Sequence, residues 1–149
     1  MTTIRQQLEL QIDFGTALRL AKVIEHQQEL RIRGVYFLIE SVSKPRKPSP
    51  FDKSVVYIGK AIKETIFTRC QKHLWSVQNA LLGSGNPRTR PGVDFKRYRE
   101  SIDFDASCLW LVPGIVAGDQ PFLISCAEEY LIYEYQRIHR RRPQANTAG

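Results

Sequence analysis

The chain has 149 residues, of which 42% are hydrophobic and 25% are charged, and its formal net charge at pH 7 is +7. This length allows one domain with a substantial core, and the composition excludes a disordered chain. The basic balance indicates a polyanionic partner, because each neutralised phosphate releases condensed counterions. Charge alone does not separate DNA, RNA and a membrane surface.

The cysteine pattern and the N-terminal residues favour a soluble protein of the reducing cytoplasm. Cys70, Cys108 and Cys126 are odd in number and lack C-x-x-C spacing, so neither a disulfide framework nor a zinc cluster is indicated. Arg5 and Glu9 interrupt any apolar N-terminal segment, and no apolar run approaches membrane-spanning length. We therefore expect a cytoplasmic protein with no membrane partner.

The first half of the chain predicts a helix followed by a hairpin. Apolar residues recur at roughly helical spacing over 14–30, which predicts an amphipathic N-terminal helix. Two β-prone runs follow at 35–39 and 55–58, separated by a proline-rich segment at 41–54 that excludes a helix. The two runs are expected to pair as an antiparallel hairpin with a long loop.

The second half predicts two further helices and a third strand. Apolar residues at intervals of four and three over 61–82 are typical of a core-facing helix. A segment rich in Arg, Pro and Gly at 86–105 is interpreted as a basic surface excursion. A strand is expected at 108–112, closed by Pro113, and Pro121 is expected to open a helix that runs to about Arg140.

Five short motifs and one lysine follow one another in a fixed order along the chain. The first two are the triplets Gly34-Val35-Tyr36 and Tyr57-Ile58-Gly59, the second of which is followed directly by Lys60. The others are an Arg-x-x-x-His step, a Glu-x-x-Leu-Ile step and a Pro-x-x-Asn ending, which fall at Arg69 and His73, at Glu128, Leu131 and Ile132, and at Pro143 and Asn146.

In this order and chemistry the chain resembles the GIY-YIG nuclease superfamily. The resemblance implies an α/β (α+β) fold with a small three-stranded, mainly antiparallel sheet flanked by helices. It also implies a single domain over 1–149, with an N-terminal helical extension at 1–33 and a catalytic core at 34–146. The implied activity is DNA endonuclease cleavage that depends on Mg²⁺ or Mn²⁺. Two intervals are long for the family: Tyr36 to Tyr57 spans 21 positions (57 − 36), and Glu128 to Asn146 spans 18 (146 − 128).

Glu128 stands out on geometry even without the resemblance. Ile124, Leu131 and Tyr135 lie at offsets of −4, +3 and +7 from it, so its side chain points where the helix buries its apolar residues. Glu129 is rotated away by about 100° and is expected to face solvent. A carboxylate on a core-facing stripe must be paired or must bind a metal, and with the family motif we expect Glu128 to be a ligand of one Mg²⁺.

Arg69 and His73 are one helical turn apart and are expected to share a cleft. A guanidinium grips two phosphate oxygens and stabilises the charge that accumulates in the transition state, which suits Arg69. For His73 three roles stay open, namely orienting the nucleophile, relaying a proton and pairing with a tyrosine.

The resemblance places Tyr36, Tyr57, Lys60 and Asn146 in the same catalytic site. A phenol acts as a base when a nearby cation or metal favours the phenolate, and Lys60 is close in sequence to Tyr57. Which tyrosine accepts the proton of the attacking water stays open. Asn146 is carried over from the motif alone.

Two groups of basic residues are candidates for a DNA-tracking groove. They are Arg88, Arg90, Lys96, Arg97 and Arg99 in the excursion, and Arg140 and Arg141 near the C-terminus. The expected partner is DNA, and a homodimer or an added specificity subunit stays open. The alternative function is a non-catalytic nucleic-acid-binding module that keeps the nuclease fold.

Overall fold

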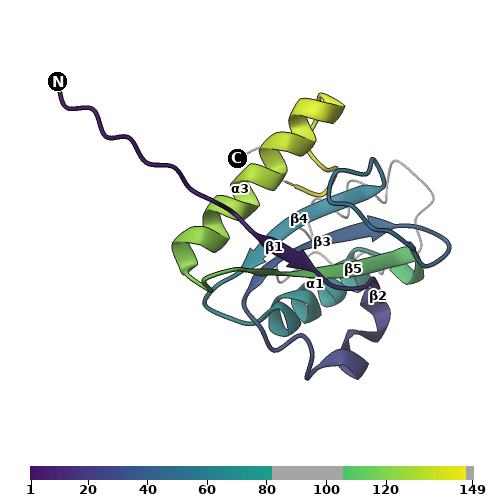
Figure 1. Ribbon diagram of the computed structural model, residues 1–149. Coiled ribbons are helices and arrows are strands. Elements are labelled where there is room, and N and C mark those ends of the chain that lie inside the picture. The colour runs from purple at the N-terminus through teal and green to yellow at the C-terminus, as the bar shows by residue number, and fades with distance from the viewer. Residues whose placement is uncertain (82–105, 147–149) are drawn as a thin grey trace.

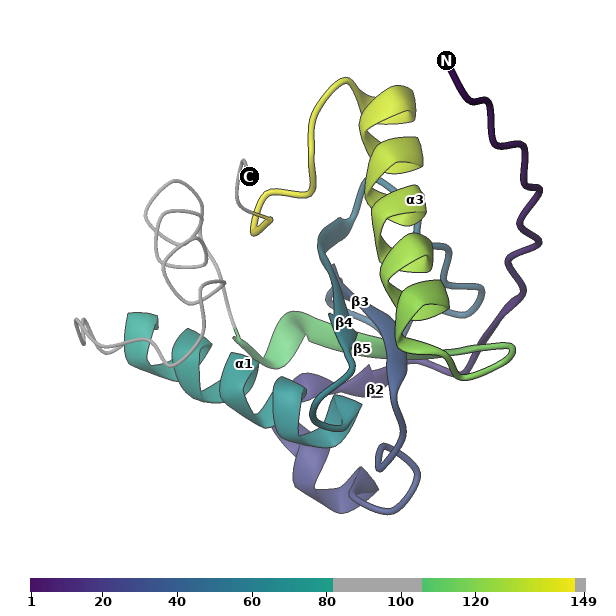
Figure 2. The same ribbon diagram turned by 90° about the vertical axis from the view of Figure 1, so that its left-hand side faces the viewer.

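The computed structural model describes residues 1–81 and 106–146, and Figures 1 and 2 show them as two views of one ribbon. The elements in chain order are strands β1 (Ile12–Phe14) and β2 (Leu18–Arg19), the 3₁₀ helix η1 (Leu20–His26), strands β3 (Gly34–Glu40) and β4 (Val55–Ala61), helix α1 (Ile66–Leu81), the 3₁₀ helix η2 (Ala106–Cys108), strand β5 (Leu109–Val116) and helix α3 (Pro121–His139).

The sheet has five strands and every pairing in it is antiparallel. The order is β1-β5-β3-β4, and β2 also pairs with β5. The expected three strands are present as β3, β4 and β5, so the mainly antiparallel α+β class is confirmed and the strand count of three is wrong. The two extra strands come from the N-terminal residues, which pair with an edge of β5 whose backbone groups would otherwise lack partners.

The helix predicted over 14–30 is wrong. That stretch forms β2 and then only the short η1, which is kinked at Lys22. The predicted apolar stripe is buried only in part, since Val23 and Leu30 are in the core while Ala21 is exposed and Ile24 is 66% exposed. Pairing with β5 competes successfully with helix formation here, because tertiary contacts override the modest differences in helix propensity.

The hairpin predicted from the two β-prone runs is confirmed. β3 and β4 pair in a register that sets Tyr36 opposite Gly59 and Phe37 opposite Ile58, with an irregularity between Leu38 and Ile39. The segment at 41–54 connects the two strands, as expected from its prolines. The register places only Tyr36, the last residue of the first triplet, opposite Gly59, the last residue of the second triplet.

The third strand is longer than predicted. β5 continues through Pro113 and Gly114 to Val116, where the sequence indicated an end at Val112. A proline removes one N–H donor from a sheet but keeps its carbonyl, and here the Pro113 carbonyl accepts a hydrogen bond from the Gly15 amide at 2.8 Å. The strand therefore tolerates the proline.

The sheet lies between two helical layers. Helix α1 and η1 cover one face, and helix α3 covers the other, as the two views show. Helix α1 begins at Ile66, five residues later than predicted, while α3 runs from Pro121 to His139 with Arg140 as its left-handed cap, as expected. Within the described residues, none of the helices combines the length and the apolar character needed to cross a membrane.

Gly34 is required by the close approach of β3 to β5. A Cβ atom added at Gly34 would overlap the backbone carbonyl oxygen of Gly114, which cannot rotate away. At Gly15, by contrast, an added Cβ would only touch the Pro113 side chain at 3.4 Å, an ordinary contact distance.

We therefore expect Gly34→Ala to lower the free energy of unfolding by about 2 kcal/mol or more, the scale of overpacking in a tight core. Gly15→Ala is the matched control and is expected to change it by less than about 0.5 kcal/mol. Urea denaturation at neutral pH measures both. Equal losses for the two variants would contradict the assigned overlap.

Candidate active site at the edge of the sheet

The predicted site residues gather around the edge strand β4, which lies between α1 and α3 in Figure 2. Successive side chains of a strand point to opposite faces, so one short strand serves both helical layers. Tyr57 faces α1, where its ring centroid lies 4.9 Å from that of His73. Lys60 faces α3, where its Nζ lies 3.2 Å from Ser125 Oγ.

A buried cluster of Tyr36, Tyr57 and His73 forms the α1 side of the site. The Tyr36 hydroxyl and His73 Nε2 share a hydrogen bond of 2.5 Å, and the two phenol rings are 6.1 Å apart between centroids. Tyr36 and His73 are completely buried, whereas Tyr57 keeps 8% of its surface exposed. Of the roles left open for His73, pairing with a tyrosine is the one that the structure shows.

Gly59 makes this cluster possible. A Cβ atom at this position would lie 2.6 Å from a ring carbon of Tyr57 and 2.7 Å from the Tyr36 hydroxyl. Both distances are far below van der Waals contact. The glycine of the second triplet therefore provides the space into which both tyrosines extend.

Burial keeps the Tyr36–His73 pair neutral. It raises the pKa of Tyr36 well above 10, with further contributions from the neighbouring Tyr57 and Cys70. Burial, helped by the positive charges of Arg69 and Lys72, lowers the pKa of His73 to about 3. At neutral pH the pair thus consists of a phenol and an uncharged imidazole that share one hydrogen bond.

Arg69 lies at the centre of the site. Its charge lowers the pKa values of both Tyr36 and Tyr57, although burial outweighs this and both pKa values end above their usual range. On its other side, its Nη1 lies 3.5 Å from a carboxyl oxygen of Glu64. Glu64 in turn binds Lys72 Nζ at 2.6 Å. The guanidinium is thus held between two phenols and a carboxylate, with a third of its side chain open to solvent.

Glu64 was not anticipated from the sequence. It belongs to no motif, and it precedes the first residue of α1 by two positions. The only sequence signal would have been an acidic residue close before a helix that carries Arg69 and Lys72. Its carboxylate orients the arginine, because an ion pair fixes one end of a long flexible side chain.

Glu128 forms the α3 side of the site. Its side chain is 15% exposed, and its Oε1 lies 3.5 Å from Lys60 Nζ. Burial raises its pKa, while the charges of Lys60 and Arg69 oppose that shift and its own charge raises the pKa of Tyr57. The carboxyl group is therefore turned inward and is electrostatically coupled to both Tyr57 and Arg69. Glu129 faces solvent, as the helical geometry indicated.

Asn146 contacts the strand rather than the centre of the site. Its Oδ1 accepts a hydrogen bond from the Ile58 amide, and its Nδ2 donates one to the Ile58 carbonyl, both at 2.9 Å. The Ala145 amide donates to the Val56 carbonyl at 2.7 Å. Asn146 therefore uses its amide to hold the outer edge of β4 between Tyr57 and Gly59. Its catalytic role stays a prediction.

The predicted DNA-tracking residues are only partly described. Arg88, Arg90, Lys96, Arg97 and Arg99 lie outside the described residues. Arg140 and Arg141 are exposed at the end of α3, and the Arg141 guanidinium lies over the Tyr135 ring at 5.6 Å from its centroid. They follow Glu128 by at least 12 residues, about 18 Å along a helix. The structure does not bring them into the cluster around β4.

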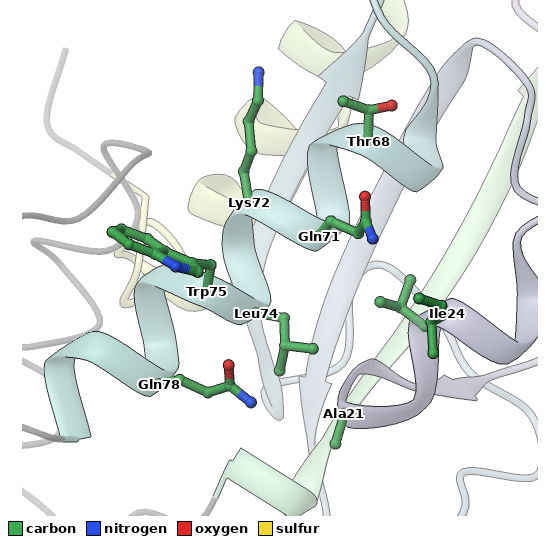
Figure 3. Close-up of a pocket in the computed structure, with 9 residues that line it drawn as sticks. Ala21, Ile24, Thr68, Gln71, Lys72, Leu74, Trp75 and Gln78 are labelled. Carbon is green, nitrogen blue, oxygen red and sulfur yellow. The ribbon is translucent and has the colours of Figure 1, made fainter.

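A separate pocket of about 490 Å³ lies between η1 and another face of α1. Figure 3 shows Ala21 and Ile24 on one side of it and Gln71, Leu74 and Gln78 on the other. Lys72, on its border, is the residue that Glu64 binds. The pocket is thus connected to the candidate site by the ion pair of Lys72 with Glu64, and none of the predicted site residues lines the pocket.

The comparisons with known proteins found no relative. No family model, no curated protein and no solved structure matches this chain. The likeness to GIY-YIG nucleases consequently stays a prediction from the sequence motifs alone.

The depressed pKa of His73 predicts a loss of stability in acid. An unfolded chain protonates histidine near pH 6.5, whereas the folded chain resists protonation down to about 3. Between these values the unfolded state binds more protons, so the free energy of unfolding falls as pH falls. Between pH 7.5 and 5 the loss from this group amounts to about 2 kcal/mol.

Urea denaturation at pH 7.5 and pH 5 of the wild type and of His73→Gln measures this loss. Glutamine does not titrate, so we expect the variant to lose about 2 kcal/mol less than the wild type between the two pH values, whatever its absolute stability. Identical losses would show that His73 titrates normally.

Proposed function

We propose that the protein is a Mg²⁺-dependent DNA endonuclease of GIY-YIG type that hydrolyses phosphodiester bonds at the edge of β4. One observation carries the proposal. A half-buried arginine, two tyrosines and an inward-turned glutamate, drawn from α1, β3, β4 and α3, are electrostatically coupled around the edge strand β4. A cluster of partly buried titratable groups with shifted pKa values is a candidate for a functional site.

The donor chemistry suits a hard divalent cation. The carboxylate of Glu128 is an oxygen ligand of the kind that Mg²⁺ prefers, and it is open enough, at 15% exposure, to be reached. Among the described residues no group of three or more His, Cys, Asp and Glu side chains could hold a metal. Glu128 would hold Mg²⁺ or Mn²⁺ together with water and substrate oxygens, and the ion would supply positive charge to the phosphate and the leaving group.

Arg69 is placed to stabilise the transition state. The charge that develops on the phosphate oxygens during in-line attack is best neutralised by a fixed, delocalised cation. Glu64 keeps the guanidinium oriented before the substrate arrives, so little reorganisation is needed. Lys60, beside Glu128, adds a second positive charge on the opposite side of β4.

Tyr57 is the better candidate for the base that takes a proton from the attacking water. It is the tyrosine that reaches solvent, and its pKa is coupled to Glu128 as well as to Arg69. Tyr36 has no exposed surface and its hydroxyl is engaged by His73, so it acts by holding Tyr57 and Arg69 in place. A cation near the Tyr57 hydroxyl favours the phenolate that the base requires.

The alternative is a DNA-binding module without catalysis. The observation that favours it is the contact between Lys60 and Glu128, which satisfies the carboxylate without any metal. Such a module would retain DNA in a salt-sensitive manner, as the net charge of +7 suggests, and would cut nothing.

The first test of the endonuclease is cleavage of supercoiled plasmid and linear DNA in Mg²⁺ or Mn²⁺. We expect Glu128→Gln and Arg69→Lys each to lower the rate of cleavage by at least about 100-fold, because one loses the metal ligand and the other the planar guanidinium. Glu129→Gln changes an exposed neighbour on the same helix and is expected to leave the rate unchanged.

Retained DNA binding with no cleavage by the wild type over a screen of metals and substrates would support the non-catalytic module. Equal cleavage by the wild type and by both site variants would refute the assigned residues.

The assignment of the base is tested by pH. Since the pKa of Tyr57 lies above its usual value of 10, the phenolate fraction grows tenfold per pH unit below that pKa. The logarithm of kcat should then rise with a slope near +1 between about pH 7 and 9. We expect Tyr57→Phe to lose about 100-fold or more and to flatten this slope, whereas Tyr36→Phe keeps the slope with a smaller loss.

Single-turnover cleavage across this pH range provides the measurement. If Tyr36→Phe flattens the profile and Tyr57→Phe does not, the two roles are reversed.

A further inference from the structure

The N-terminal residues form an extended arm that leaves the body of the protein. In both Figure 1 and Figure 2 the arm runs outward from β1 without folding back. Residues 1–10 make no hydrogen bond to the rest of the described chain, and Gln11 is the first anchored residue, through its carbonyl and the Ala117 amide at 2.9 Å. Ile4 is 88% exposed and Leu8 is 51% exposed. In an extended chain both side chains point to the same side.

The outer face of α3 carries a second set of exposed apolar groups. Phe122, Tyr130 and Tyr133 are 63%, 47% and 64% exposed. At about 100° per residue they fall within an arc of roughly 80°, away from the sheet that Ile124 and Leu131 contact. Aromatic residues grouped on one exposed helix face are typical of a protein interface.

The distribution of charge favours the outer face of α3 as a contact surface between two copies of the chain. The chain has a net charge of +7, so most surfaces of two copies repel each other. On the outer face of α3 the exposed Glu129 is balanced by Arg137, one turn beyond Tyr133, whose guanidinium pairs with Glu134. The arm carries one cation, Arg5, and one anion, Glu9. A nearly neutral arm against a helix face with little net charge avoids that repulsion.

We propose that two copies of this chain form a dimer by exchanging their arms, each arm packing on the outer face of the other copy's α3. Ile4 and Leu8 lie about 13 Å apart in an extended arm, close to the roughly 12 Å that separates Phe122 from Tyr130 along a helix. The arm is anchored to Ala117, which lies four residues before Pro121, the first residue of α3. The arm therefore leaves the body of the protein near the N-terminal end of α3. A two-fold axis beside α3 therefore makes both contacts identical and closes the assembly.

The exchange leaves the candidate active site open. Glu128 points toward β4, on the side of α3 opposite to Phe122 and Tyr133, so the partner's arm does not cover it. The dimer would carry two copies of the site in one particle. The proposal does not depend on the nuclease assignment, because its test measures mass and not cleavage.

Sedimentation equilibrium of the full chain over a range of concentrations tests the dimer. We expect the wild type to approach twice the chain mass of 17.2 kDa. The arm variant Ile4→Ser with Leu8→Ser, and the helix variant Phe122→Ser with Tyr133→Ser, should each weaken dimerisation by at least about tenfold. A control with two exposed aliphatic residues elsewhere, Ile24→Ser with Val42→Ser, should match the wild type.

Mixing distinguishes exchange between copies from packing within one copy. The arm variant keeps an intact helix face and the helix variant keeps an intact arm, so an equimolar mixture restores one of the two contacts. We expect the mixture to dimerise more strongly than either variant alone. A wild type that stays at 17.2 kDa at every concentration, a control variant as weak as the others, or a mixture no better than its components would overturn the proposal.

Discussion

The pairing of β3 with β4 in a single register is the constraint on which the candidate site depends. Tyr36 pairs with Gly59 across the two strands. The rings of Tyr36 and Tyr57 occupy the space that a side chain at position 59 would need. A slip of β4 by one residue would turn Tyr57 to the face of α3 and separate it from Tyr36 and His73. The bond from Asn146 to Ile58 on the outer edge of β4 reinforces this register from the other side.

The groups around that strand lie on both faces of the sheet. The α1 face carries a neutral, buried phenol–imidazole pair beside Arg69, and the α3 face carries the Lys60–Glu128 pair. Burial raises the pKa of both tyrosines and of Glu128, while the charges of Lys60 and Arg69 oppose the shift at Glu128. An arriving phosphate would meet preorganised positive charge with little to rearrange.

The proposed arm exchange draws on parts of the chain that the site does not use. The aromatic face of α3 and the apolar arm are both remote from β4, and neither is needed for the internal packing of the described residues. In a protein whose net charge opposes self-association, a helix face with little net charge is a suitable place for contact between copies.

The sequence by itself determined the hairpin, the burial of the α1 and α3 stripes and the inward direction of Glu128, because these follow from local periodicity and β-branched composition. It indicated a helix at 14–30 that does not form, and it could not show that residues 12–14 and 18–19 complete the sheet, since strand pairing over a hundred residues leaves no local signal. Only the tertiary structure decided that Glu64 orients Arg69 and that Tyr36 pairs with His73. It also decided that Asn146 holds the backbone of β4. The contacts of Tyr36 with His73 and of Asn146 with Ile58 join groups 37 and 88 residues apart, so packing between elements sets their distances.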